Sequence, residues 1–430
     1  MNPGARIAAA IEVLDDIETR HRPAADALKD WGLSHRFAGS KDRAALATLV
    51  FDALRCRASA AWIMGEETPR AIVLGSLREM RGLSADDIAA LCSGEAHAPA
   101  PLSELERTRL ATATLDGAPD PVRGNYPDWL APAFAAAFGP RAADEGRALA
   151  ARAPLDLRVN TLKATREKAL AALGHLGATP TPLSPLGLRL PLSEDGRSPS
   201  LAGEPAYVKG LVEIQDEGSQ LAARLGAAEP GEQVLDLCAG GGGKTLALAA
   251  AMDNRGQIYA TDRETRRLAP LHARLERAGT RNVQIRTPRR NQDVLADLAA
   301  RCDLVLVDAP CTGTGTWRRN PDAKWRIRSG ALEQRIKEQD EVLDSAAHYV
   351  KPGGRLIYVT CSLLREENEE RIAAFLARQS DFEAIAAQEL VARAGLPVLA
   401  PFIEGDGLRL SPLTSQTDGF FVAGLKRGAG

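Results

Sequence analysis

Two cysteines follow apolar runs that are typical of buried β-strands. Cys311 ends the run 305–311, and Cys361 ends the run 356–361. Ligands and reactive groups collect at the carboxyl ends of strands in a parallel α/β sheet, so two neighbouring strands would present both thiols to one substrate. A thiolate is a soft nucleophile that can add to C6 of a pyrimidine ring, and a second acid or base is then needed to release the product. These two cysteines are the first candidates for catalysis.

A glycine-rich loop follows another predicted strand, residues 234–237. The loop reads Cys238-Ala239-Gly240-Gly241-Gly242-Gly243-Lys244-Thr245 and opens a predicted helix. Glycines allow the backbone to pass close to a ligand, and the amides of a helix N-terminus offer hydrogen-bond donors. A P-loop would need glycine at Cys238, and a dinucleotide fingerprint would need glycine at Thr245. Both nucleotide motifs therefore fail, and S-adenosylmethionine (SAM) is the third ligand to consider.

Acidic residues stand at four successive strand ends, and they favour SAM. Asp262 ends the second predicted strand, where a carboxylate can accept both ribose hydroxyls, as the comparable acid does in dinucleotide folds. Asp293 follows the third strand and could reach the adenine amino group. Each acid alone could equally be a strand-end cap or a surface charge. Together with Asp236 and Asp308 they indicate a cofactor site along one edge of a sheet.

The second half of the chain alternates short apolar runs with helical patterns. Candidate strands are residues 234–237, 257–261, 283–286, 303–307 and 355–360, with helical stretches between the first four. This alternation predicts a parallel, doubly wound sheet. A late pair near 382–385 and 420–425 could close the sheet as an antiparallel hairpin, which is typical of methyltransferases.

The first half predicts two further modules. Residues 6–115 read as helices: Ile7, Ile11, Leu14 and Ile17 share one helical face, and Ser84 is placed to cap the helix that follows it. Residues 125–218 mix strand patterns at 155–159 and 186–192 with helices that Asp128 and Thr165 could cap. We therefore expect a helical domain at 1–120, a small α+β module at 121–218 and an α/β catalytic domain at 219–430.

Length, composition and charge exclude several classes of protein. At 430 residues, with 45% hydrophobic and 26% charged residues, the chain suits two or three globular domains. Its six cysteines form no Cys-x-x-Cys pair, so we expect neither a zinc site nor a disulfide framework, and reduced thiols suit a cytoplasmic protein. We expect no signal peptide, no membrane span and a monomer.

The net charge is −2, but Lys and Arg cluster in two places. Nine arginines lie between Arg263 and Arg290, and a second basic run lies between Trp317 and Arg328. Such runs are most often solvated helix faces. Because both flank the predicted active-site strands, we expect them to form a rim that contacts phosphates.

Taken together, these motifs resemble the RsmB/Nop/Sun family of SAM-dependent RNA (cytosine-5) methyltransferases, over residues 125–426. The matching segments are 236–245, 308–315, 318–322, 360–362 and 418–421, preceded by 157–162 and 215–220. The helical N-terminal region resembles the NusB-like domain of the bacterial ribosomal-RNA members. The loop departs from the family's usual Ala-Pro-Gly-Gly-Lys, and the extra glycine freedom costs entropy on ordering. The fold implied is a Rossmann-like methyltransferase domain with a seven-stranded, mostly parallel sheet.

The resemblance also implies roles for individual residues. Cys361 would be the thiolate that adds to C6 of cytosine, and Cys311 would assist loss of the C5 proton and release of the enzyme. Asp308 could hold cytosine N3, and Lys244 could supply the electropositive setting that a reactive thiolate needs. The implied SAM contacts are Cys238, Ala239, Gly240, Gly241, Gly242, Gly243, Lys244, Asp262, Arg267, Asp293 and Asp308.

The expected substrate is RNA, with 16S ribosomal RNA first and transfer RNA second. The target base must be single-stranded or flipped out of its stack. Trp317, Trp325 or Tyr358 could stack on a base, although each is more often part of a core. Two other functions are weighed against this one. Both cysteines and Asp262 argue against an RNA-binding assembly factor without activity. The segments 157–162, 215–220 and 360–362 resemble the RNA family and disfavour a DNA cytosine methyltransferase, in which the cysteine of the Pro-Cys pair is the nucleophile.

Overall fold

The computed structural model describes residues 1–193 and 198–429 and divides into two compact units. The first comprises Met1–Arg152 together with Trp317–Ser329, and the second comprises Ala153–Thr316 and Gly330–Gly430. The segment Trp317–Ser329 therefore belongs by its contacts to a unit that is otherwise built from the first third of the chain. The division into three domains stays a prediction.

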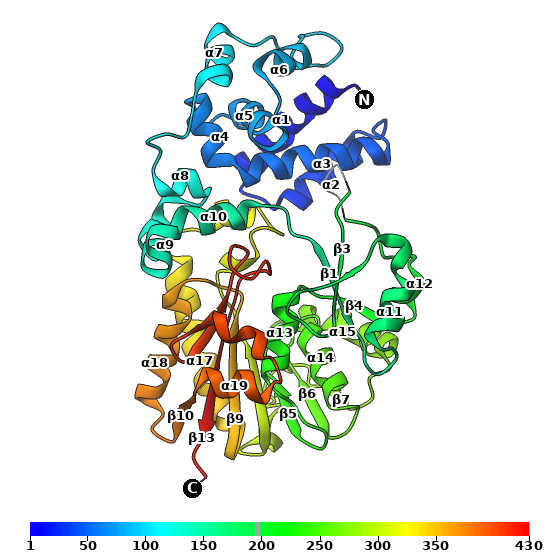
Figure 1. Ribbon diagram of the computed structural model, residues 1–430, viewed down its shortest axis with the longest axis vertical. Coiled ribbons are helices and arrows are strands. Elements are labelled where there is room, and N and C mark those ends of the chain that lie inside the picture. The colour runs from blue at the N-terminus through cyan, green and yellow to red at the C-terminus, as the bar shows by residue number, and fades with distance from the viewer. Residues whose placement is uncertain (194–197, 430) are drawn as a thin grey trace. The chain divides into compact units, whose positions relative to one another are not determined.

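The regular elements described in the first unit are all helices; in Figure 1 its segment Met1–Arg152 runs from blue to cyan-green and its segment Trp317–Ser329 is yellow. Its elements are α1 (Pro3–Arg20), α2 (Ala24–Ser34), α3 (Ser40–Arg55), α4 (Arg57–Met64), α5 (Pro69–Arg81), α6 (Ala85–Leu91), α7 (Glu104–Thr112), α8 (Asp120–Gly124), α9 (Ala131–Phe138), α10 (Ala142–Ala150) and α16 (Ala323–Arg326), with 3-10 turns η1 (Asp128–Leu130) and η2 (Gly139–Arg141). The helical prediction for this region is confirmed, while its likeness to NusB stays a prediction.

Local sequence explains where these helices begin and which face they bury. In α1, Ile7, Leu14 and Ile17 are buried and Ile11 is half-buried against the same core, as their spacing predicted. The Ser84 side chain accepts the backbone N–H of Asp87, which completes the predicted cap of α6. Asp128 does not cap a helix: it is the first residue of η1, which precedes α9.

A small antiparallel sheet begins the second unit. Its strands are β1 (Leu155–Val159), β2 (Thr179–Pro180), β3 (Gly187–Leu190) and β4 (Val212–Ile214), in the order β2-β3-β1-β4. It is accompanied by α11 (Arg166–Ala172), η3 (Gly174–Leu176) and α12 (Pro205–Val208). The Thr165 side chain caps α11 by accepting the backbone N–H of Lys168 at 3.3 Å. The predicted strand at 155–159 and the predicted cap are both confirmed.

The large sheet carries the cysteines. Its order is β11-β12-β13-β9-β8-β5-β6-β7, with β10 also paired to β13. The strands are β5 (Gln233–Asp236), β6 (Gln257–Ala260), β7 (Val283–Ile285), β8 (Cys302–Asp308), β9 (Val350–Thr360), β10 (Phe382–Ile385), β11 (Ile403–Glu404), β12 (Gly407–Leu410) and β13 (Phe420–Arg427). Strands β5 to β9 run parallel and β10 to β13 pair antiparallel, as the sequence predicted for the first five strands and for the late pair.

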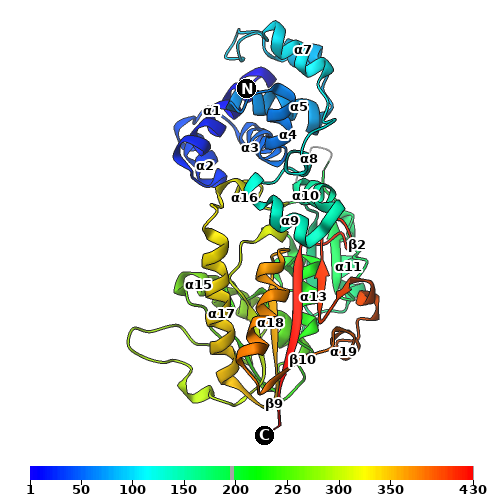
Figure 2. The same cartoon turned by 90° about the vertical axis from the view of Figure 1, so that its left-hand side faces the viewer.

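Helices cover both faces of this sheet because successive side chains of a strand point to opposite faces. Leu304 and Leu306 pack in one core with α13 (Glu217–Leu225), α14 (Gly243–Ala251) and α19 (Ala387–Arg393). Val305 and Val307 pack in another core with α17 (Ala331–Tyr349) and α18 (Glu369–Arg378). Figure 2 views the face that α17 and α18 cover. The remaining elements are α15 (Thr265–Ala278), η4 (Ala296–Leu298), η5 (Thr314–Thr316), η6 (Arg365–Glu367) and η7 (Pro397–Phe402).

Two features of the sheet differ from the prediction. The sheet has nine strands rather than the expected seven, because β11 and β12 form an additional hairpin; β12 pairs with the first half of β13 and β10 with the second half. The helix expected between β7 and β8 is replaced by the single turn η4. Among the described residues, no helix combines the length and apolar character needed to cross a membrane.

Candidate active site

The two predicted cysteines meet at one edge of the large sheet. Strands β8 and β9 are parallel neighbours, with Asp308 opposite Val359, so the loops that follow them leave the sheet side by side. The Sγ atoms of Cys311 and Cys361 lie 3.4 Å apart, and both side chains are half-buried. The loops are tied by the Gly315 N–H, which donates to the Cys361 carbonyl at 2.9 Å. Both thiols can therefore face one substrate.

The surroundings of Cys311 favour its protonated form. Its hydrogen bond with Cys361, its burial and the negative charge of Glu367 raise the pKa of the Cys311 thiol well above its usual value. A thiol that keeps its proton can donate a hydrogen bond to a neighbouring thiolate and can act in proton transfer. The environment of Cys311 therefore suits a thiol that holds its proton.

An ion pair connects the glycine loop to the cysteine edge. Lys244, in the first turn of α14, is buried and its Nζ lies 2.7 Å from Oδ2 of Asp308, the last residue of β8. The ammonium group also lies 5.2 Å from the ring centroid of Phe420. Asp308 is one-third exposed, so it can meet a ligand from the open side while Lys244 holds it from within.

The glycine loop has a backbone that needs glycine at two positions. Gly240 and Gly242 have φ values of +52° and +83°, which other residues rarely adopt. A Cβ atom at Gly242 would lie 2.1 Å from Cδ1 of Leu271. The Gly240 N–H donates to Oδ2 of Asp262 at 2.9 Å, which brings the loop and the acid at the end of β6 together as predicted.

The remaining strand-end acids differ in their surroundings. Asp262 is 2% exposed and pairs with Arg267 at 3.0 Å. Asp236 is buried and accepts the Thr245 hydroxyl through Oδ2 at 2.6 Å, whereas its Oδ1 is buried with no partner in the protein. Burial raises the pKa of Asp236 to about 7. Asp293 is exposed and accepts the Leu295 N–H of its own turn, so its contact with adenine stays a prediction.

These features fit SAM. The loop backbone, the buried carboxylate of Asp262 and the unpartnered Oδ1 of Asp236 offer acceptors and a close approach at one end of the sheet. The Cys238 and Ala239 positions belong to the same loop, where the Ala239 N–H donates to the Thr261 carbonyl at 2.8 Å. In the described part of the chain, no cluster of three or more His, Cys, Asp or Glu could hold a metal ion.

The predicted basic rim is only partly available to RNA. In the first cluster, Arg274 and Arg277 both bind the buried carboxylate of Glu213. In the second cluster, Arg318 and Lys324 are buried inside the first unit, with 4% and 1% exposure. The prediction that these last two side chains contact phosphates is therefore wrong, because side chains packed inside a helical core cannot reach an RNA backbone.

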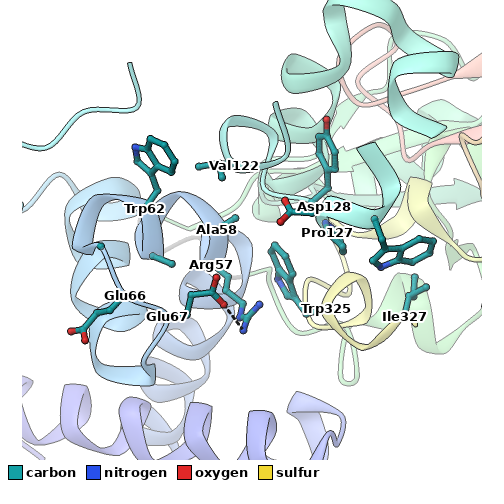
Figure 3. A pocket seen from close by; sticks show the side chains of 14 residues that line it. Arg57, Ala58, Trp62, Glu66, Glu67, Val122, Pro127, Asp128, Trp325 and Ile327 are labelled. Carbon is teal, nitrogen blue, oxygen red and sulfur yellow. Dashed lines mark ion pairs between the residues drawn. The ribbon is translucent and has the colours of Figure 1, made fainter. Parts of the chain in front are cut away.

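The three aromatic candidates for base stacking differ in their burial. Trp317 and Tyr358 are buried in the cores of their units. Trp325 is half-buried and lines a pocket of about 560 Å³ in the first unit, together with Trp62 and Pro127 (Figure 3). Its indole N–H donates to the Leu54 carbonyl at 2.7 Å. Only Trp325 thus keeps exposed ring surface.

Sequence reasoning missed the groups that hold the cysteine loops in place. Glu367 accepts hydrogen bonds from Thr312, Ser362 and Gln339, although it lies in the acidic run 366–370 that looks like the solvated start of a helix. The hydroxyl residues that directly follow each cysteine were the available signal, because a buried hydroxyl pair needs a common acceptor.

Comparisons with known proteins agree with this geometry. Residues 223–426 match the family model described as 16S rRNA methyltransferase RsmB/F, and residues 126–193 match its RsmF/B-like ferredoxin-like domain. The chain is 33% identical over 306 residues to the probable ribosomal RNA small subunit methyltransferase B of Synechocystis sp., covering 70% of this chain and 67% of that protein. It is 31% identical to the corresponding protein of Bacillus subtilis, covering 74% and 71%.

A solved structure extends the likeness to the whole chain. The crystal structure of PH0851 covers 99% of this chain and 99% of its own, with a TM-score of 0.72 and 26% sequence identity. The fold, the two matched family models and the curated relatives agree with the motifs at the cysteine edge and the glycine loop. The chain therefore belongs to the RsmB/F methyltransferase family.

Proposed function

We propose that this protein methylates C5 of a cytosine in RNA, with SAM as methyl donor and 16S ribosomal RNA as substrate. The observation that carries the proposal is the pair of thiols 3.4 Å apart at the ends of two adjacent parallel strands. The substrate rests on the relatives, which are named as ribosomal RNA small subunit methyltransferases. We expect the protein to act in the cytoplasm and as a monomer.

SAM supplies an electrophilic methyl group on a sulfonium sulfur. We assign its binding to the loop 238–244, with the Asp262 carboxylate accepting the ribose hydroxyls and Arg267 neutralising that carboxylate. Asp293 is assigned to the adenine amino group. Asp308 is held by Lys244 between the glycine loop and the cysteines, so its carboxylate can contact both SAM and the cytosine.

The reaction proceeds through a covalent adduct. The Cys361 thiolate forms a bond to C6 of the cytosine, and the C5–C6 π electrons move onto C5, which becomes nucleophilic. The C5 carbon then takes the methyl group, whose former bonding pair stays on the donor sulfur. Cys311 gives its own proton to solvent, and its thiolate then takes the C5 proton. The electrons of the C5–H bond form the C5–C6 double bond, and the C6–S bond breaks with its electrons returning to Cys361.

The residues around this ring make each step easier. Asp308 accepts a hydrogen bond at the N3 side of the cytosine and favours its protonation, which makes C6 more electrophilic. Cys311, whose pKa is raised, gives a strongly basic thiolate for the C5 proton and a stable thiol afterwards. The assignment of separate roles to the two sulfurs rests on the resemblance to the family.

Two substitutions test the proposal on the full chain. Cys361→Ala should abolish methylation of unmodified 16S RNA while leaving SAM affinity unchanged, because the nucleophile does not bind the cofactor. Cys311→Ala should accumulate a protein–RNA adduct that migrates slowly on a denaturing gel. Cys92→Ala, in the core of the first unit, is the matched control. Bisulfite sequencing of the product RNA identifies the methylated cytosine.

The possible results separate the alternatives. Turnover by the Cys361→Ala variant, or absence of the slow species with Cys311→Ala, would contradict the covalent mechanism. Methylation of transfer RNA in place of 16S RNA would correct the substrate. A wild-type chain that binds RNA and SAM without transferring a methyl group would show an assembly factor instead of an enzyme.

A further inference from the structure

A buried carboxylate joins the two loops that carry the cysteines. Glu367 ends η6, just after β9, and its side chain is fully buried. Oε1 accepts the Thr312 N–H at 2.8 Å and a Gln339 amide N–H at 3.0 Å. Oε2 accepts the hydroxyls of Thr312 and Ser362. One carboxylate thus receives four neutral donors from three separate segments.

The donors stand at matching positions beside the thiols. Thr312 directly follows Cys311 in the chain, and Ser362 directly follows Cys361. Because both hydroxyls end on the same oxygen of Glu367, the two cysteine backbones are held at a fixed separation. A change at Glu367 would remove an anchor that both loops share.

Other contacts fix the carboxylate itself. The Gln339 amide, on α17, also donates to the carbonyl of Pro310, the residue before Cys311, at 2.9 Å. The Tyr358 hydroxyl, on β9, donates to the backbone carbonyl of Glu367 at 2.7 Å. Glu367 is therefore anchored to the rigid helix and strand that flank the site.

Burying a carboxylate among neutral donors is unfavourable for the fold. Removal from water raises the pKa of Glu367 although its hydrogen bonds act in the opposite direction. Buried ionisable groups cost stability unless they are fully satisfied, and an apolar side chain of similar volume is often better tolerated. A group that is costly to the fold and linked to both thiols points to a role in the site.

We propose that Glu367 is a positioning residue that holds the thiols of Cys311 and Cys361 in register for one substrate, acting through Thr312 and Ser362. The inference rests on the proposed function, and it adds a residue that neither reacts nor touches the substrate. The positioning depends on the two side-chain oxygens of Glu367 as hydrogen-bond acceptors and on the length of the side chain that holds them. The negative charge of Glu367 is secondary.

Three substitutions separate geometry from charge. In Glu367→Gln, the amide oxygen can still accept the Thr312 N–H, and the amide N–H groups can donate to the two hydroxyl oxygens. The hydroxyl proton of Ser362 can then turn to Thr314 Oγ1, which lies 3.2 Å away. Glu367→Asp keeps the charge but withdraws the carboxylate by one methylene, and Glu367→Ala removes it. Glu370→Ala, on the exposed surface of α18, is the control.

The kinetic readout is kcat for methylation measured apart from KM for RNA and the Kd of SAM. We expect Glu367→Ala and Glu367→Asp to lower kcat by about a hundredfold, because misplaced reactive groups lose that much. We expect Glu367→Gln to retain kcat within about fivefold, the size of one altered hydrogen bond. The KM for RNA and the Kd of SAM should stay within about threefold in all variants.

A second readout needs neither RNA nor SAM. Phenylarsine oxide condenses with two adjacent thiols to form two As–S bonds and one water, and mass spectrometry of the intact protein counts the product. Wild-type and Glu367→Gln chains should form the bridged product, and Cys311→Ala and Cys361→Ala should not. Glu367→Asp should bind the arsenical at least about tenfold more weakly if the thiols have separated.

The outcomes distinguish this inference from the proposed function. Suppose the wild type forms no 5-methylcytosine, but binds the arsenical in the bridged form while Glu367→Asp does not. The proposed function is then wrong and the positioning role stands. If the wild type is active and Glu367→Asp matches it in kcat and in bridging, the positioning role is overturned. A Glu367→Gln variant as impaired as Glu367→Asp would also overturn it, because charge would then be the essential property.

Discussion

Lys324 provides a quantitative test of how the first unit is built. Its side chain is 1% exposed, its Nζ donates to the Arg55 carbonyl at 2.9 Å, and it lies 5.0 Å from the ring centroid of Trp325. Burial, helped by the positive charge of Arg55, lowers the pKa of Lys324 from its ordinary 10.5 to about 7. The ammonium form is thus unfavourable in the folded chain.

The sign of the pH dependence follows from proton binding. Between pH 7 and 10.5 the unfolded chain keeps the Lys324 proton and the folded chain has lost it. The unfolded state therefore binds more protons, so the stability of the wild type rises with pH over this window. From pH 7 to pH 9 the gain is about 2 kcal/mol.

Replacing Lys324 with methionine removes this dependence. Methionine keeps an unbranched apolar stem and loses only the hydrogen bond to Arg55 O, which is worth about 1 kcal/mol. At pH 7 we expect Lys324→Met to be more stable than the wild type by about 3 kcal/mol. The advantage should shrink by about 2 kcal/mol by pH 9.

The chain offers a selective probe for this measurement. All five tryptophans (Trp31, Trp62, Trp129, Trp317 and Trp325) belong to the first unit. Urea unfolding of the full chain, followed by tryptophan fluorescence, therefore reports that unit at each pH. Lys29→Met, at an exposed position of α2, is the control and should change stability by less than about 0.5 kcal/mol.

Two results would refute the reasoning. A difference between Lys324→Met and wild type that stays constant from pH 7 to pH 9 would show that the lysine is not held in its neutral form. A large loss of RNA affinity without a change in stability would return Lys324 to the basic rim that the sequence predicted.

Two further predictions concern the second unit. Asp262→Asn should raise the Kd of SAM by about tenfold or more in calorimetry, because a hydrogen bond to a charged acceptor is worth about 1.5–3 kcal/mol; an unchanged Kd would remove Asp262 from the cofactor site. Burial raises the pKa of Asp236 from 3.8 to about 7, so the folded state binds the extra proton and wild-type stability falls as pH rises through this range. The free energy of unfolding of Asp236→Asn, relative to that of the wild type, should therefore rise by about 3 kcal/mol from pH 4.5 to pH 8. Urea unfolding followed by circular dichroism measures this difference. A difference that does not change with pH would contradict the raised pKa of Asp236.

The sheet and the cysteine pair could be predicted because their signals are local. Short apolar runs with an acid or a cysteine at their ends indicate strands whose termini meet at one edge. Strands β5 to β8 lie close to the predicted runs, β9 begins five residues earlier at Val350, and the two sulfurs are in contact. The loop–acid contact between Gly240 and Asp262 follows from the same geometry.

The features that sequence missed depend on contacts between distant segments. Lys324 and Arg318 read as exposed charges, yet they are buried against residues far away in the chain, such as Arg55. Glu367 lies in an acidic run and becomes a buried acceptor only when α17 and both cysteine loops surround it. The hairpin of β11 and β12 has strands too short to give a periodic signal.

The segment Trp317–Ser329 has a consequence for how the chain is made. The polypeptide crosses from the first unit to the second after Arg152, returns at Trp317 and leaves again after Ser329. During synthesis, the helices of the first 152 residues emerge long before the segment that supplies Trp317 to stack on Phe134 at 5.8 Å. The first unit can reach its final packing only after strands β5 to β8 have been translated, and no single proteolytic cut can release it intact, because its two segments are separated in the chain.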